Sequence, residues 1–70
     1  MKELTREIVQ YIDTYKEDGK WTGEVNMVSW NGGEVKIDIR NWNEDHSKCS
    51  KGITLTTEEA RTLGEILTRI

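Results

Sequence analysis

The chain has 70 residues, of which 34% are hydrophobic and 33% charged, and its formal net charge at pH 7 is −3. This length predicts one domain with a small core, for which dimerisation is a common remedy. No hydrophobic run is long enough to span a membrane, no signal peptide is recognisable, and a single cysteine cannot form an internal disulfide. We therefore expect a cytoplasmic protein in a reducing compartment, with no membrane partner.

The first segment, residues 4–17, fits two kinds of secondary structure. A helix would gather on one face Leu4, Ile8, Tyr15 and either Tyr11 or Ile12. A strand would alternate polar residues with Val9, Tyr11 and Tyr15. Periodicity alone favours the helix slightly, and residues 17–20 (EDGK) predict a turn in either case.

Residues 24–42 predict a β-hairpin around the sequence Asn31-Gly32-Gly33, which tolerates positive φ. A three-residue loop, typically a type I turn with a glycine bulge, is the length that gathers the apolar side chains on one face. This register pairs Trp30 with Glu34, Val28 with Lys36, Met27 with Ile37, Asn26 with Asp38, Val25 with Ile39 and Glu24 with Arg40. We expect the core to contain Val25, Met27, Ile37 and Ile39, together with Trp21, which has the same parity.

The opposite face of this hairpin would carry Trp30, Lys36, Arg40 and Trp42. Lys36 could serve solubility alone, and Arg40 could be only the cross-strand partner of Glu24. Two tryptophans on a polar face are costly to leave in water, which indicates a binding surface or an oligomer contact. Aromatic rings beside cations suit single-stranded nucleic acid, because its bases stack and its phosphates are anionic.

The acidic balance argues against indiscriminate binding to nucleic acid. The acidity lies mainly at the ends of the chain, because residues 1–19 carry three cations and five anions, whereas residues 20–56 carry five of each. We therefore expect a modest salt dependence, from a few phosphate contacts per protomer at about −0.7 log units each.

The polar loop at residues 43–50 offers little for catalysis or metal binding. His46 and Cys49 lie three residues apart, but cysteine catalysis needs a thiolate held by the fold against an oriented base. These two residues with Glu44 or Asp45 make a poor ligand set for structural zinc. We expect a connection here, with Lys48 near phosphate.

The C-terminal segment predicts an amphipathic helix that begins after Thr56. Thr56 and Glu59 have the spacing of a capping box. An apolar stripe follows at helical spacing and contains Ala60, Leu63, Ile66, Leu67 and Ile70. We expect this stripe to be core, and the alternative is that it meets the same stripe of a second protomer.

Two separated motifs resemble the transcriptional positive cofactor four family, and most closely its small bacterial YdbC-like branch. The first runs from VSWN through VKIDIR to the aromatic Trp42, and the second is KGITL at residues 51–55, followed by an acidic helix start. The resemblance covers roughly residues 21–70. The loop at residues 43–50 is shorter than in eukaryotic members, and their basic, serine-rich N-terminal region is absent, so no regulatory tail is carried over.

The resemblance implies an α+β fold in which a curved four-stranded antiparallel sheet, about residues 6–55, precedes one helix, about residues 57–69. It implies that residues 4–17 form a strand, and that the single domain, residues 1–70, forms a homodimer. It also implies binding of single-stranded DNA without strong sequence preference. The family's binding roles fall on Trp30, Arg40, Trp42 and Lys51.

The sequence therefore predicts a single-stranded DNA-binding homodimer, not an enzyme, that serves transcription, replication or repair, with RNA as an alternative ligand. Bases would stack on Trp30 and Trp42, and further contacts would come from Lys20, Asn26, Lys36, Arg40 and Lys51. The dimer interface would include Leu63, Leu67 and Ile70. We expect no cofactor, metal or small-molecule substrate. The rival hypothesis is a protein-interaction module that uses the face of Trp30 and Trp42.

Overall fold

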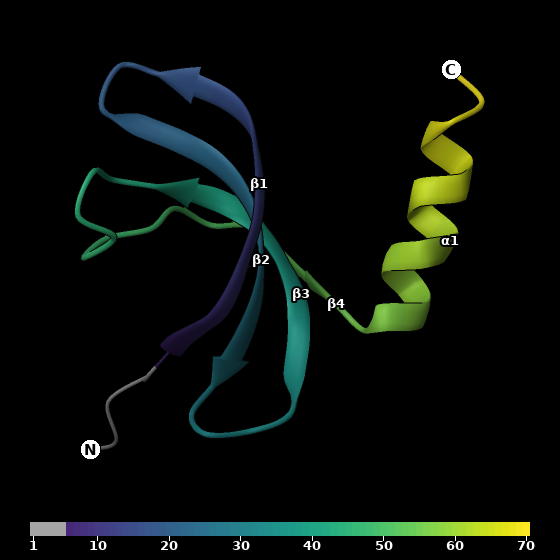
Figure 1. Cartoon of the computed structure of the whole chain (residues 1–70), viewed down its shortest axis with the longest axis horizontal. Helices are drawn as coiled ribbons and strands as arrows, with labels where there is room; N and C mark the ends of the chain where they lie inside the picture. The colour runs from purple at the N-terminus through teal and green to yellow at the C-terminus, as the bar shows by residue number, and fades with distance from the viewer. Residues whose placement is uncertain (1–5) are drawn as a thin grey trace.

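The computed structural model describes residues 6–70, which form one antiparallel sheet followed by a helix (Figure 1). The elements are β1 (Arg6–Asp18), β2 (Trp21–Trp30), β3 (Val35–Trp42), β4 (Ile53–Leu55) and α1 (Thr57–Leu67), and the strands pair in chain order. The expected α+β class and the order of its elements are confirmed. Leu4, on which the helical alternative partly depended, lies outside the described residues.

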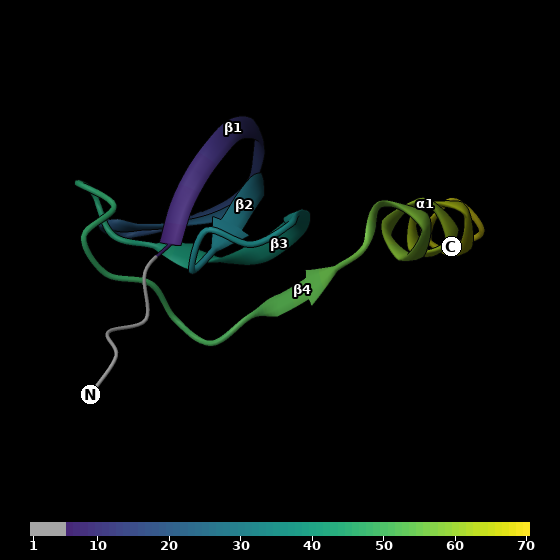
Figure 2. The ribbon, with the colours of Figure 1, turned by 90° about the horizontal axis from the view of Figure 1, so that it is seen from below.

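The first element, β1, is a strand with an unusual spacing. Its register against β2 shifts between Ile8 and Gln10, between Tyr11 and Asp13, and between Thr14 and Lys16. As a result every third residue of β1 faces the same side. Bulges of this kind bend a strand and increase its twist, and Figure 2 shows β1 arching over the other strands. The strand is confirmed, and its register shifts explain why strict alternation was weak in its sequence.

The central hairpin has the predicted register, because Val28 lies opposite Lys36 and Met27 opposite Ile37. Its turn differs from the expected type I turn. Asn31 and Gly32 both have positive φ, of 53° and 70°, and the amide of Gly33 donates to the carbonyl of Trp30 at 2.9 Å. Positive φ at both central residues is the requirement of a type I′ turn, which matches the twist of the flanking strands.

The predicted core was wrong about which face of the sheet is buried. The sheet curls so far that it encloses its polar face, where Val28 is 0% and Trp42 1% exposed. Three polar side chains share this enclosed face, and they are Glu24, Asn26 and Asp38. The predicted core residues Val25, Met27, Ile37 and Ile39 lie on the outer side and are only half-buried, and Trp21 is 38% exposed.

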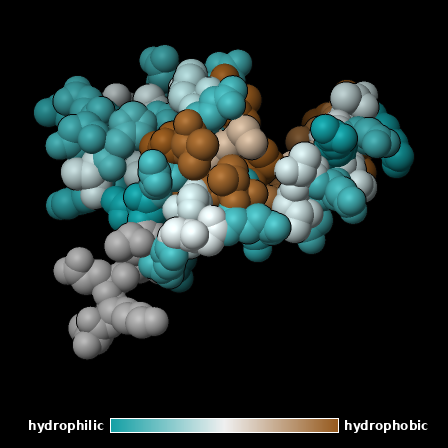
Figure 3. All heavy atoms as spheres, turned by 60° about the horizontal axis from the view of Figure 1, so that its bottom comes forward, coloured by the Kyte–Doolittle hydropathy of each residue, from teal (hydrophilic) through white to brown (hydrophobic). Residues whose placement is uncertain are grey.

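The helix α1 begins as predicted, because Thr56 and Glu59 form both hydrogen bonds of a capping box. It stands apart from the curled sheet (Figures 1 and 2), and none of its residues is buried. Leu63 is half-buried, whereas Leu67 is 53% and Ile70 101% exposed. The expectation that this stripe is core of the same chain was therefore wrong. Figure 3 shows apolar side chains gathered on the sheet beside the helix.

Candidate nucleic-acid interface

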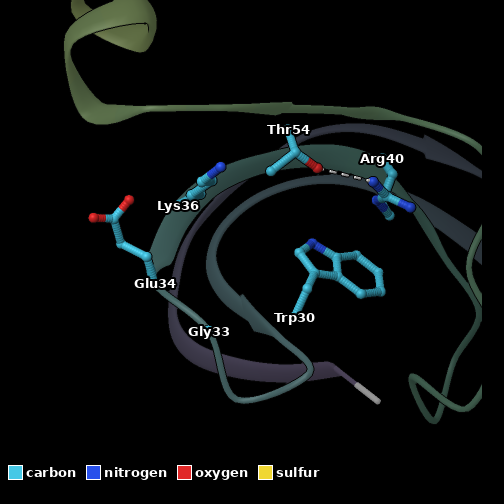
Figure 4. A pocket seen from close by; sticks show the side chains of 6 residues that line it. All are labelled: Trp30, Gly33, Glu34, Lys36, Arg40 and Thr54. Atoms are coloured by element: carbon cyan, nitrogen blue, oxygen red, sulfur yellow. Dashed lines mark hydrogen bonds between the residues drawn. The ribbon is translucent and has the colours of Figure 1, made fainter. Parts of the chain in front are cut away.

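An open groove of about 520 Å³ lies where the end of β2 meets β3 and β4. It is lined by Trp30, Gly33, Glu34, Lys36, Arg40 and Thr54 (Figure 4). In this view the indole of Trp30 points toward Arg40, within the curve of the strands. The structure thus brings together three of the predicted binding residues, which are Trp30, Lys36 and Arg40.

The guanidinium of Arg40 is fixed in this groove by Asp38. Nε of Arg40 donates to one carboxylate oxygen at 2.6 Å, and Nη2 donates to the other at 2.8 Å. The same guanidinium donates to Thr54 Oγ1 at 3.3 Å and to the carbonyl of Ser50 at 3.4 Å. Planar, bidentate pairs of this kind have both strength and defined geometry. Arg40 lies opposite Glu24 in the register, as predicted, but its ion pair is with Asp38, so the suggestion that it serves only Glu24 was wrong.

Sequence reasoning missed Asp38 and Thr54 as parts of this site. Asp38 is 0% exposed, and Thr54 Oγ1 donates to its Oδ1 at 2.9 Å. Asp38 lies two residues before Arg40, a spacing that places both side chains on one face of a strand. This spacing is the signal in the sequence that could have identified the pair.

Trp30 is half-buried, and its ring lies against the guanidinium of Arg40. The Cζ atom of Arg40 is 4.9 Å from the ring centroid, which is within the range of a cation–π contact. The indole Nε1 is buried and has no hydrogen-bond partner among the described residues. Trp30 therefore combines a fixed orientation with a donor that is still unsatisfied.

Trp42, the second predicted stacking platform, is not an exposed surface. Its side chain is 1% exposed, and Arg6 and the ring of His46 lie against it. The expectation of two exposed tryptophans was wrong for this residue, because the curl of β1 brings Arg6 over its ring. The rival hypothesis of a docking face that needs Trp30 and Trp42 loses one of its two rings.

A second polar cluster surrounds the buried carboxylate of Glu24. Thr22 Oγ1 donates to it at 2.5 Å and Asn26 Nδ2 at 3.1 Å, while His46 Nε2 is 3.0 Å from both carboxylate oxygens. Burial raises the pKa of Glu24, but the hydrogen bonds from Thr22, Asn26 and His46 outweigh it and hold the pKa below its ordinary value of 4.5. The cluster ties the loop at residues 43–50 to β2.

Asn26 was predicted to reach the edge of a base, but in this structure its side chain is 0% exposed. Its amide nitrogen is used by Glu24, and its Oδ1 has no partner in the part of the chain that the structure describes. Asn26 is thus buried on the enclosed polar face, and it could contact a ligand only if this face opened.

Two predicted lysines lie outside the groove. Lys20 is exposed and lines a separate hollow of about 380 Å³ with Trp21 and Lys48. Lys51 is exposed beside Gly52 and does not line the groove. A Cβ on Gly52 would clash with the carbonyl oxygen of Ile39, so this glycine lets the chain pass close to β3.

Within residues 6–70 there is no group of three or more metal-binding side chains that could hold an ion. His46 is engaged by Glu24, and Cys49 lies opposite Trp42 in an isolated β-bridge. In the same range, no helix has the length and apolar character needed to cross a membrane.

The sequence of this chain is similar to those of known proteins. A family model described as Transcriptional Coactivator p15 (PC4) matches residues 16–66, which is more than half of the chain. An uncharacterized protein of Treponema pallidum (strain Nichols) is 47% identical over 47 residues, which cover 67% of this chain and 55% of that protein. The chain thus spans just over half the length of this relative. It belongs to the transcriptional coactivator p15 (PC4) family.

Proposed function

We propose that this chain binds single-stranded DNA as a homodimer, without strong sequence preference, and serves transcription, replication or repair. The family to which it belongs is a non-enzymatic one known for single-stranded DNA binding and coactivation. The observation that carries the proposal is the open groove in which the indole of Trp30 lies against Arg40 and beside Lys36. Bases of any sequence can stack on such a ring, which is why strong base preference is not expected.

The two cations of the groove, Arg40 and Lys36, have different roles. Arg40 uses donors on all three of its nitrogens within the protein, so it acts mainly as a rigid support for Trp30. Lys36 lines the groove, and we assign it to phosphate. Lys20 and Lys51 would contact phosphates outside the groove. This division predicts a shallow salt dependence, since few cations are available for counterion release.

Homodimerisation is supported by the apolar surface that one chain leaves in water. On the outer face of the sheet Val35 is 39% and Ile53 48% exposed, and on the helix Leu67 is 53% exposed. Surfaces of this kind are normally covered by an interface. We assign them to a second protomer, with Leu63, Leu67 and Ile70 of the helix in the interface.

Fluorescence anisotropy of a labelled twenty-nucleotide oligothymidine, titrated at several salt concentrations with unlabelled duplex as competitor, tests the proposal. We expect saturable binding that the duplex does not displace. Trp30→Ala should weaken binding by about 1–3 kcal/mol, the usual contribution of one stacked base. Lys36→Ala should reduce the salt slope, whereas the matched control Lys16→Ala, an exposed lysine of β1, should not. Absence of binding at low salt would refute the proposal.

The rival protein-interaction hypothesis predicts a different result in the same assay. A docking surface around Trp30 would leave the anisotropy of the oligonucleotide unchanged, and Trp30→Ala would then have no effect on it. The RNA alternative is separated by repeating the titration with an oligouridine of equal length, because stacking and phosphate contacts occur with both nucleic acids.

A further inference from the structure

The two tryptophans of the polar face form matching contacts with arginine, but in opposite states of access. The Cζ atom of Arg40 lies 4.9 Å from the ring centroid of Trp30, at the open groove. The Cζ atom of Arg6 lies 5.3 Å from the ring centroid of Trp42, which is 1% exposed. One ring is therefore open to a ligand, and the other is buried, with Arg6 and the ring of His46 against it.

The two arginines are held very differently. Arg40 forms a bidentate ion pair with Asp38, a carboxylate that is 0% exposed. Arg6 is the first residue of β1, and its Nη2 donates to the carbonyl of Ser47 at 2.7 Å in a hydrogen bond on the surface. Water can replace such a surface bond at little cost. Arg6 can thus leave its tryptophan far more easily than Arg40 can.

The site beneath Arg6 is also incomplete in hydrogen bonding. Nε1 of Trp42 is buried without a hydrogen-bond partner in the described part of the chain. Buried donors and acceptors without partners destabilise a fold, and they are rare in native proteins. Opening of this corner toward a polar ligand would supply the missing partner of the Trp42 N–H.

On these observations, and resting on the function proposed above, we propose that Arg6 is a displaceable cover over Trp42, the second ring to which the family resemblance assigns a binding role. When single-stranded DNA enters the groove at Trp30, a further base replaces the guanidinium on Trp42, and Arg6 turns to a phosphate of the same strand. Arginine suits both positions, because its planar cation stacks on aromatic faces and pairs with phosphate oxygens. Arg6 is thus a DNA-binding residue that the sequence patterns did not single out.

The indole N–H resonances of Trp21, Trp30 and Trp42 allow a test that needs no mutation. In ¹⁵N-labelled protein titrated with oligothymidine, we expect the signals of Trp30 and Trp42 to shift together. If the signal of Trp30 shifts and that of Trp42 does not, the proposed displacement of Arg6 is refuted, while the proposed DNA-binding function still holds. If neither signal moves, both proposals fail.

Variants of Arg6 test its second role. Arg6→Ala should reduce the salt slope of binding by about 0.7 log units, the value of one lost contact with a single strand. Arg6→Lys should keep the slope, because it keeps the charge, and Lys16→Ala serves as the control with an equal loss of charge. In free Arg6→Ala the Trp42 indole hydrogen should exchange faster with solvent. An unchanged salt slope in a folded Arg6→Ala protein would show that Arg6 only attaches β1 to the loop at residues 43–50. If Arg6→Ala does not fold, Arg6→Gln replaces it in the same comparison.

Discussion

Replacement of Asp38 by asparagine tests how the groove is built. The carboxylate of Asp38 is 0% exposed and pairs with Arg40, whose side chain is 13% exposed. Removal of one partner from a buried ion pair costs about 3–5 kcal/mol, because the other charge is left without compensation. Asparagine keeps one acceptor oxygen, and Arg40 retains some access to water. We therefore expect Asp38→Asn to lower the free energy of unfolding by about 2–3 kcal/mol.

Urea unfolding at a fixed protein concentration, followed by tryptophan fluorescence, measures this loss. A double-mutant cycle with Arg40→Met isolates the pair, and we expect a coupling energy of about 1 kcal/mol or more. Asp18→Asn, at the exposed end of β1, is the matched control and should change little. A loss below about 0.5 kcal/mol for Asp38→Asn, the size of an ordinary surface substitution, would refute the assignment of Asp38 as the anchor of Arg40.

Three further predictions concern other parts of the fold. Because the pKa of Glu24 is lowered by folding, the unfolded state binds a proton at Glu24 more readily than the folded state does. The ionised carboxylate therefore stabilises the fold above pH 4.5, and this stabilisation is lost as the pH falls through the folded-state pKa. Glu24→Gln should remove this pH dependence from a plot of the free energy of unfolding against pH. Gly52→Ala should destabilise by about 1–3 kcal/mol in thermal unfolding, since its Cβ would meet the backbone of Ile39, and an unchanged melting temperature would contradict the close approach. Gly64→Ala has open space in the single chain and should stabilise α1 by about 1 kcal/mol, whereas a loss of stability would place Gly64 against a partner.

The local elements could be predicted from the sequence because each depends on neighbouring residues. The capping box of Thr56 and Glu59 and the register of the central hairpin follow from spacing alone. The strand β1 could not be read from spacing, because bulges give it a period near three. Only the family resemblance indicated that it is a strand.

The buried face could not be predicted, because it depends on the curvature of the whole sheet. Alternation shows that Val25 and Ile39 share one face and that Asn26 and Asp38 share the other. It does not show which face the curl encloses. The same limit applies to the candidate site: Trp30, Lys36 and Arg40 were found by their shared face, whereas Trp42 was assigned to a surface that Arg6 covers.

The curled sheet separates the surface that we assign to DNA binding from the surface that we assign to dimerisation. On its enclosed face Asp38 pairs with Arg40, and the carboxylate of Glu24 is hydrogen-bonded by Thr22, Asn26 and His46. The fully buried apolar side chains of that face are Val28 and Trp42, whereas the outer face and the helix leave apolar side chains exposed. Covering those exposed surfaces would therefore add to the stability of so short a chain. A second protomer on those surfaces would leave the groove at Trp30 free. Loss of the dimer should therefore lower stability first, and DNA binding only as a consequence of unfolding.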